Sequence, residues 1–137
     1  AAEVRGVTIH CHAVATLPMI EIDAALIERA LANLVENALR YTPAGGSIAL
    51  SAAAADAGIS INVNDTGCGI ANADMERVFE RFFQSTHSRE GNGHAGLGLA
   101  IVKRVAALHN GHVAVRNRSG NGACFTLWLP LTPSDSL

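Results

Sequence analysis

The sequence lacks the features that would tie the chain to a membrane or to a strongly charged partner. Its formal net charge at pH 7 is −2, so no excess of basic residues is present to attract nucleic acid or an anionic membrane surface. No stretch approaches the roughly 18 uninterrupted apolar residues of a transmembrane helix, and no signal peptide is visible. These absences argue against nucleic acid and the membrane surface as direct partners.

Cysteine is also scarce. Cys11, Cys68 and Cys124 are odd in number and share no close spacing, so they do not form the framework of a disulfide-stabilised secreted domain. A reduced, cytoplasmic compartment fits this usage best. The chain begins with Ala rather than Met, and we expect it to be a piece of a longer protein.

The 137 residues are enough for one domain with its own core, and we expect a single ordered domain over about residues 7–130 of the chain 1–137. Helices and strand pairs follow one another in the pattern, which favours a mixed sheet with helices layered on one face over a doubly wound parallel sheet. The predicted strands are 7–14, 19–22, 47–53, 58–64, 112–117 and 123–130, and the predicted helices are 24–41, 72–84 and 96–109. Asp23 is the expected N-cap of the first helix, which Thr42 and Pro43 should end, and Val78, Phe82 and Phe83 should supply apolar contacts from the second.

The first predicted helix has an unusual polar stripe. Asn33, Asn37 and Arg40 fall within an arc of about 60° on a helical wheel, with Glu36 on one flank and Tyr41 on the other. Amide oxygens are hard ligands suited to Mg²⁺, and a guanidinium suits phosphate oxygens. Taken alone, the stripe favours a solvated helix face that carries a Glu36–Arg40 pair.

Two glycine-rich segments follow. Residues 65–70 read DTGCGI directly after a predicted strand, where Gly67 and Gly69 allow a close backbone approach and Asp65 offers a carboxylate to an exocyclic amine. Residues 91–102 read GNGHAGLGLAIV, so free N–H groups at the start of the third helix form an anion site. Each segment alone could be an ordinary turn or linker.

In this order the motifs are highly specific, and the chain resembles the ATP-binding catalytic domain of sensor histidine kinases, within the wider family of gyrase, the Hsp90 chaperones and MutL. The resemblance covers nearly the whole chain, from Val7 to Pro130. It rests on Asn33-Leu-Val-Glu-Asn37-Ala-Leu-Arg40-Tyr41, Asp65-Thr-Gly67-Cys-Gly69, Phe79-Glu-Arg-Phe82-Phe83, Gly96-Leu-Gly98-Leu99 and the terminal Gly120-Asn-Gly122-Ala-Cys-Phe125 with Leu129-Pro130.

The resemblance implies a two-layer α/β sandwich in which a mixed, mostly antiparallel sheet carries three helices on one face. It implies that Asp65 accepts a hydrogen bond from the adenine amino group, that Asn37 ligates Mg²⁺, and that residues 85–95 form a lid over ATP. The implied catalytic residues are Asn33, Asn37 and Arg40, and the implied nucleotide-binding residues are Asn33, Asn37, Arg40, Tyr41, Asp65, Gly67, Gly69, Ile70, Phe82, Gly96, Leu97, Gly98 and Leu99.

The chain also departs from the family pattern, with Gln84, His94-Ala95 and Ala123 where relatives commonly have a basic residue, Gly-Thr or Gly-Ser, and Thr or Ser. In the gyrase and chaperone branches, a glutamate one turn before the magnesium-binding asparagine activates water. Asn33 occupies that position here, and an amide cannot take a proton at neutral pH. The chain therefore favours a kinase over a hydrolase.

The resemblance implies protein-histidine kinase activity in two-component signalling, in which the γ-phosphoryl group of ATP passes to a histidine on a separate dimerisation domain and then to a response regulator. None of the six histidines here lies in the H-E-x-x-x-P context of such a phosphoacceptor. We expect a dimeric parent bound to the inner membrane, with this domain in the cytoplasm and monomeric alone. The alternatives are an autonomous ATPase of the gyrase or chaperone type, a module that only holds nucleotide, and a serine kinase of the anti-sigma type.

Overall fold

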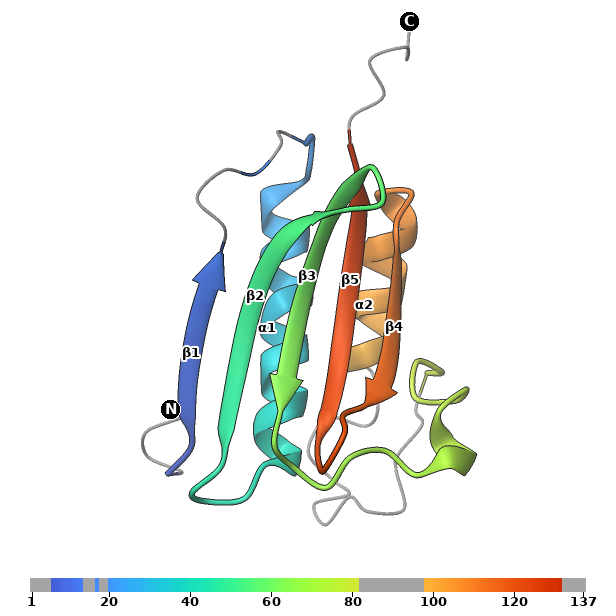
Figure 1. Cartoon of the computed structure of the whole chain (residues 1–137). Coiled ribbons are helices and arrows are strands. Elements are labelled where there is room, and N and C mark those ends of the chain that lie inside the picture. The colour runs from blue at the N-terminus through green and yellow to red at the C-terminus, as the bar shows by residue number, and fades with distance from the viewer. Residues whose placement is uncertain (1–5, 14–16, 18–19, 82–97, 132–137) are drawn as a thin grey trace, which may run out of the picture.

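The computed structural model describes residues 6–13, 17, 20–81 and 98–131, and its centre is a five-stranded mixed sheet (Figure 1). The strand order is β1-β2-β3-β5-β4. The β1–β2 pair is parallel and the other pairs are antiparallel, which confirms the predicted mixed, mostly antiparallel sheet. The strands are β1 (Thr8–Ala13), β2 (Ser47–Ala55), β3 (Gly58–Asp65), β4 (His112–Asn117) and β5 (Ala123–Pro130).

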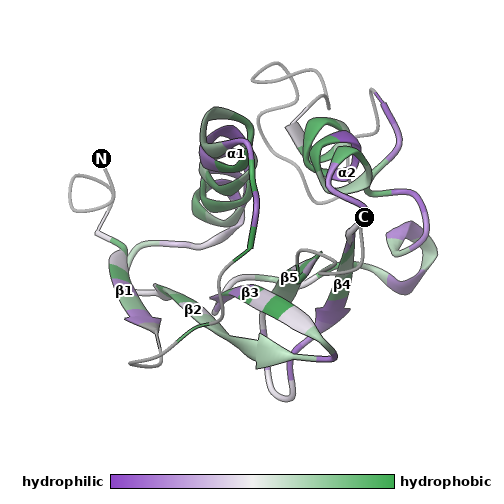
Figure 2. Ribbon diagram, turned by 90° about the horizontal axis from the view of Figure 1, so that it is seen from above, coloured by the Kyte–Doolittle hydropathy of each residue, from purple (hydrophilic) through white to green (hydrophobic). Residues whose placement is uncertain are grey.

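Two helices, α1 (Ala24–Tyr41) and α2 (Gly98–Leu108), lie side by side on one face of the sheet (Figure 2). The helix α1 connects the parallel strands β1 and β2, as a parallel pair requires a crossover. In the part of the chain that the structure describes, no helix is long and apolar enough to cross a membrane.

The ends of α1 are fixed by side chains, as the sequence predicts. Asp23 is the N-cap residue, and its carboxylate accepts a hydrogen bond from the Leu26 N–H at 3.2 Å. At the other end, the Thr42 hydroxyl donates to the Ala38 carbonyl at 2.7 Å, and the chain then turns through Pro43. These contacts fix the residues at which α1 begins and ends, and so the length of helix that carries the polar stripe.

The core lies between the helices and the sheet. Leu34 and Ala38 of α1 are fully buried there, together with Val63, Phe125 and Leu127 from the two central strands. Successive residues of a strand point to opposite faces, so this apolar layer covers only the side of the sheet that faces the helices.

Leu34→Ala is expected to lower the free energy of unfolding by about 2–5 kcal/mol, because it leaves a cavity at the centre of this layer. Urea denaturation followed by circular dichroism measures the change. The matched control is Arg29→Ala on the exposed side of the same helix, which should shift stability by about 0.5 kcal/mol or less. A Leu34→Ala variant as stable as the control would contradict this account of the core.

The predicted strand at 19–22 is wrong for the residues that the structure describes. Residues 20–22 have no regular secondary structure, and Ile22 is 43% exposed. This stretch belongs to the crossover that carries the chain from β1 to the capped start of α1, so it has no neighbouring strand with which to pair. The mixed sheet therefore has five strands in the described residues, not six.

The predicted helix at 72–84 is also corrected. Its first residues form one 3₁₀ turn, η1 (Asn72–Asp74), and the chain continues to residue 81 in further turns. The backbone bonds here join residues three apart, such as Arg77 N–H to Asp74 C=O at 2.8 Å. Val78 is 5% exposed in the core, as predicted, and Phe79 packs edge-on against Phe125 with ring centroids 6.0 Å apart, so the segment reaches the core without an α-helix. The helix layer accordingly contains two α-helices in the described residues, not three.

Candidate nucleotide-binding site

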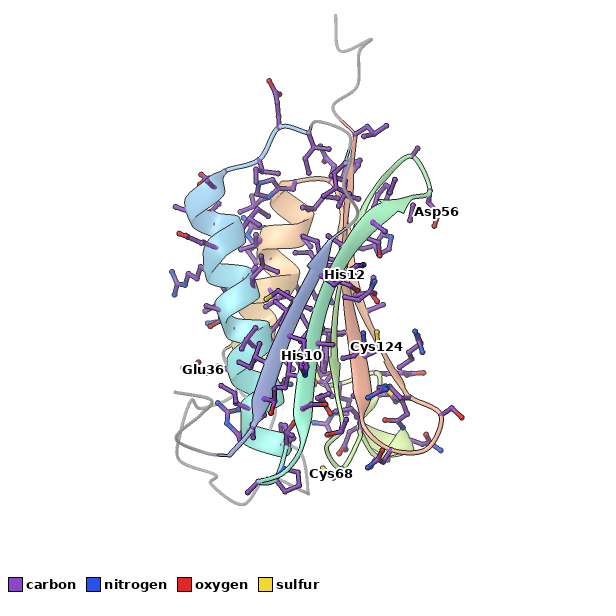
Figure 3. All side chains as sticks on the ribbon, turned by 60° about the vertical axis from the view of Figure 1, so that its left-hand side comes forward. His10, His12, Glu36, Asp56, Cys68 and Cys124 are labelled. Atoms are coloured by element: carbon purple, nitrogen blue, oxygen red, sulfur yellow. The ribbon has the colours of Figure 1, made fainter. Side chains whose placement is uncertain are left out.

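Three segments meet at one end of the molecule, the lower end in Figure 1: the last turns of α1, the loop that follows β3, and the start of α2. A Cβ added at Gly98 would lie 3.9 Å from the Asn33 side chain, which places the first turn of α2 beside the polar stripe of α1. A Cβ at Gly67 would collide with the Tyr41 carbonyl oxygen, so the loop presses against the end of α1. Cys68, in the middle of the loop, marks this end of the molecule in Figure 3.

The two asparagines of α1 have the environment expected of ligand-binding amides. Asn37 is only 8% exposed, and Asn33 has a buried side-chain nitrogen that has no hydrogen-bond partner among the described residues. A buried unpaired donor is uncommon in folded proteins because it loses its water without gaining an acceptor. An anionic oxygen next to the start of α2 would supply that acceptor.

The donor set also fits Mg²⁺ held jointly with a ligand. Among the described residues, no group of three or more His, Cys, Asp or Glu side chains could hold a metal ion. The buried Asn37 amide is a neutral hard ligand of the type that Mg²⁺ accepts alongside phosphate oxygens and water. A single amide ligand from the protein therefore suits a Mg²⁺ ion whose other ligands are phosphate oxygens and water.

Asp65 lies at the end of β3 with its carboxylate held from one side. It is 3% exposed, and its Oδ1 accepts from the Gly67 N–H at 2.8 Å and the Ala123 N–H at 3.2 Å. No described residue donates to Oδ2, which leaves this oxygen available for a donor on a ligand. Burial raises the pKa of Asp65 above its ordinary value, and the two N–H groups and the Arg118 guanidinium oppose that increase.

The first turn of α2 supplies the third part of the site. The described part of this helix spans Gly98–Leu108, and the N–H groups of its first turn, which include that of Leu99, have no carbonyl partner within that described part. They carry the positive end of the helix dipole at the place where Asn33 has its unpaired nitrogen. The combination favours a phosphate group over a neutral ligand.

The structure brings together most of the residues that the sequence predicted. Ile70 is 7% exposed and anchors the loop in the core. The described members of the predicted set are Asn33, Asn37, Arg40 and Tyr41 on α1, Asp65, Gly67, Gly69 and Ile70 in the loop, and Gly98 and Leu99 on α2. Phe82, Gly96, Leu97 and the predicted lid at 85–95 lie outside the described residues.

Other residues of the site were missed by the sequence analysis. Arg118 donates from its guanidinium to the Asp65 carbonyl at 2.9 Å, and Thr66 accepts from the Ser47 N–H at 2.9 Å. Arg118 is 53 positions from Asp65 in the chain, so local sequence patterns carry no sign of this contact. Only the antiparallel pairing of β3 with β5 brings the two together.

Comparisons with known proteins agree with this geometry. A family model described as "Histidine kinase-, DNA gyrase B-, and HSP90-like ATPase" matches residues 22–133. The sensor-like histidine kinase SenX3 of Mycobacterium tuberculosis is 50% identical over 109 residues, which cover 79% of this chain and 27% of SenX3. The chain therefore spans little more than a quarter of the length of this curated relative.

Solved structures give the same result. The mycobacterial sensor histidine kinase MprB superimposes with a TM-score of 0.85 at 30% identity, over 96% of this chain and 89% of the MprB chain. Full-length ShkA, solved in complex with AMPPNP, superimposes with a TM-score of 0.82 at 36% identity, over 96% of this chain and 27% of that chain.

Proposed function

The chain belongs to the family of histidine kinase-, DNA gyrase B- and HSP90-like ATPases, as a catalytic domain of the sensor histidine kinase type, and we propose that it binds ATP with Mg²⁺ and transfers the γ-phosphoryl group to a histidine on a separate helical domain. The observation that carries this proposal is the meeting of three groups at one end of the fold. These are the Asp65 carboxylate with one oxygen paired, the buried Asn37 amide together with the buried side-chain nitrogen of Asn33, and the first described turn of α2 at Gly98.

Each group has a separate task in the proposed reaction. Asp65 accepts from the adenine amino group through the oxygen that the loop leaves unpaired. The N–H groups at the start of α2 and the Asn33 amide bind phosphate oxygens, and Arg40 offsets their charge from the last turn of α1. Asn37 would hold Mg²⁺, which when bound neutralises charge on the phosphates. The chain thereby orients the γ-phosphate for in-line attack by an imidazole nitrogen, with ADP as the leaving group.

The same residues argue for transfer to a histidine over transfer to water. Asn33, one turn before Asn37, has an amide that cannot act as a base at neutral pH. Glu36 lies on the exposed side of α1 (Figure 3). Because the side chain at position 33 cannot activate water as a base, bound ATP should persist until a histidine nucleophile arrives.

We also propose the wider setting that this activity requires. The phosphoacceptor histidine belongs to a dimerisation domain of the parent protein, and the phosphoryl group then passes to a response regulator. The similarity to sensor histidine kinases and the share of SenX3 that the chain spans support a longer parent. We place this domain in the cytoplasm, monomeric by itself, within a dimeric membrane-bound sensor.

The purified chain is expected to bind ATP and to hydrolyse it barely above the uncatalysed background. Adding a helical domain that carries its cognate histidine should produce acid-labile phosphohistidine on that domain, measured with radiolabelled ATP and acid treatment. Robust ATP turnover by the chain alone, abolished by Asn37→Ala, would contradict the kinase proposal and favour an autonomous ATPase. Acid-stable phosphoserine on a partner would instead favour a serine kinase of the anti-sigma type.

A further inference from the structure

The side chain of Asn117, the last residue of β4, forms a two-point contact with the loop that follows β3. Its Oδ1 accepts from the Ile70 N–H at 2.7 Å, and its Nδ2 donates to the Ile70 carbonyl at 2.8 Å. The two residues are 47 positions apart. One side-chain amide thus pairs with both polar groups of one residue, as a neighbouring strand would.

The rest of the β4–β5 turn holds the other end of the same loop. Arg118 donates to the Asp65 carbonyl at 2.9 Å, and Asn121 donates to the Thr66 carbonyl at 3.3 Å. The Ala123 N–H donates to the Asp65 carboxylate at 3.2 Å. The loop is therefore attached to the turn at its start by several groups, and at its end by Asn117 alone.

The loop needs an external attachment because its own sequence gives it little rigidity. Gly67 and Gly69 stand on either side of the exposed Cys68, and Gly69 has φ +78°, a conformation that side-chain-bearing residues rarely adopt. A Cβ at Gly69 would lie 2.9 Å from Asn117 Oδ1, so this glycine lets the backbone approach the amide closely. The Asn117–Ile70 pair therefore helps to fix the position of the far end of the loop.

We propose that Asn117 is a positioning residue of the nucleotide site, whose amide clamps Ile70 and thereby holds loop 65–70 where Asp65 can select adenine. This inference rests on the proposed function, because it assumes that Asp65 faces the adenine amino group. Asn117 acts through the loop and does not need to touch the nucleotide. Its partner Ile70 is 7% exposed and packs in the core, so the two hydrogen bonds join the end of β4 to a well-packed residue of the loop.

The position of Asn117 separates this role from a purely structural one. Asn117 itself is exposed and its two hydrogen bonds with Ile70 are part-buried, so water can replace them in part and their loss should lower global stability only modestly. Its loss should therefore leave the sheet folded. The effect should appear in how well the loop distinguishes one base from another.

The test compares ATP with ITP, which carries an oxygen in place of the adenine amino group. Asn117→Leu removes both hydrogen bonds at similar size, and Asn117→Asp keeps an acceptor for the Ile70 N–H but sets a carboxylate oxygen against the Ile70 carbonyl. Ser119→Ala, in the exposed part of the same turn, is the matched control. Dissociation constants for both nucleotides with Mg²⁺ are measured by calorimetry, with melting temperatures alongside.

Both Asn117 variants are expected to weaken ATP binding at least about fivefold and to reduce the preference for ATP over ITP about threefold or more, whereas Ser119→Ala keeps both values. Partial unfolding lowers both apparent affinities equally and cannot change their ratio, so the preference isolates positioning. Faster amide exchange at Ile70 in the variants provides a second measurement of the lost clamp.

The two ways of failing are distinct. A wild-type chain that binds neither nucleotide would overturn the proposed function and this inference with it. A wild-type chain that prefers ATP, with Asn117 variants that keep the full preference, would overturn the positioning role alone. An unchanged preference combined with a lower melting temperature would assign Asn117 a structural role only.

Discussion

Asp65→Asn is expected to weaken ATP binding by about tenfold to a hundredfold while leaving the fold at least as stable as the wild type. The lost interaction is a hydrogen bond to a charged group in a buried position, which contributes about 1.5–3 kcal/mol. The Asn Oδ1 can still accept from the Gly67 and Ala123 N–H groups, so the loop keeps its internal bonds. The Asn Nδ2 then meets the adenine amino group donor to donor.

ITP provides the control ligand for this variant. Its base presents an acceptor where adenine has a donor, so Asp65→Asn should lose affinity for ATP and gain relative affinity for ITP. Calorimetric titration of both nucleotides with Mg²⁺ measures the change in preference. Unchanged ATP affinity, or equal losses for the two nucleotides, would remove Asp65 from the base-recognition site.

The stability side of this prediction follows from the sign of the pKa shift. Burial raises the pKa of Asp65 above its ordinary value of 3.8, so the folded chain binds the proton more tightly than the unfolded chain does. Below pH 3.8 the group is protonated in both states and costs nothing, and stability is lost as pH rises through the raised folded pKa. At neutral pH, Asp65→Asn should therefore have an equal or higher melting temperature, and the advantage should vanish under acid conditions.

Asn37→Ala is expected to abolish most of the benefit that Mg²⁺ gives to ATP binding. In the proposed function its buried amide completes the oxygen shell of the ion, so the affinities measured with Mg²⁺ and with EDTA should converge. Adenosine, which carries no phosphate, should bind the variant nearly as well as the wild type. The measurement is calorimetric titration of ATP and adenosine in both buffers.

Arg29→Ala is the matched control, since Arg29 is exposed on the same helix away from the site. It should keep the full Mg²⁺ dependence. Equal losses of ATP and adenosine binding in Asn37→Ala, together with a lower melting temperature, would indicate a folding defect. A variant that keeps its Mg²⁺ dependence would show that the metal ligand lies elsewhere.

The parts of this fold that were predictable from sequence are those fixed by local chemistry. The Asp23 cap and the turn after Thr42 bound α1 as predicted, because capping and helix termination depend on adjacent residues. Five of the six predicted strands are present for the same reason. The polar stripe of α1 needed no tertiary information beyond the period of a helix.

The parts that were missed depend on contacts between distant residues. The segment after Asn72 was predicted as a helix, but Phe79 packs against Phe125 from the turns that follow the short 3₁₀ helix η1. Residues 20–22 were predicted as a strand but have no strand beside them. Whether a partner strand is available cannot be deduced from the local sequence. Asn117 and Ile70 are 47 positions apart, so the local sequence around either residue gives no indication of their contact.

The sheet order has a consequence for how the site assembles during folding. The pairs β2–β3 and β4–β5 are local hairpins that can close early, whereas β3 meets β5 only after a long loop has been closed. Asp65 receives the Ala123 N–H at that late meeting, which joins the two halves of the chain. A chain still emerging from the ribosome would already possess the asparagines of α1 and yet lack a formed adenine acceptor. Nucleotide would therefore recognise only chains whose two hairpins have already joined.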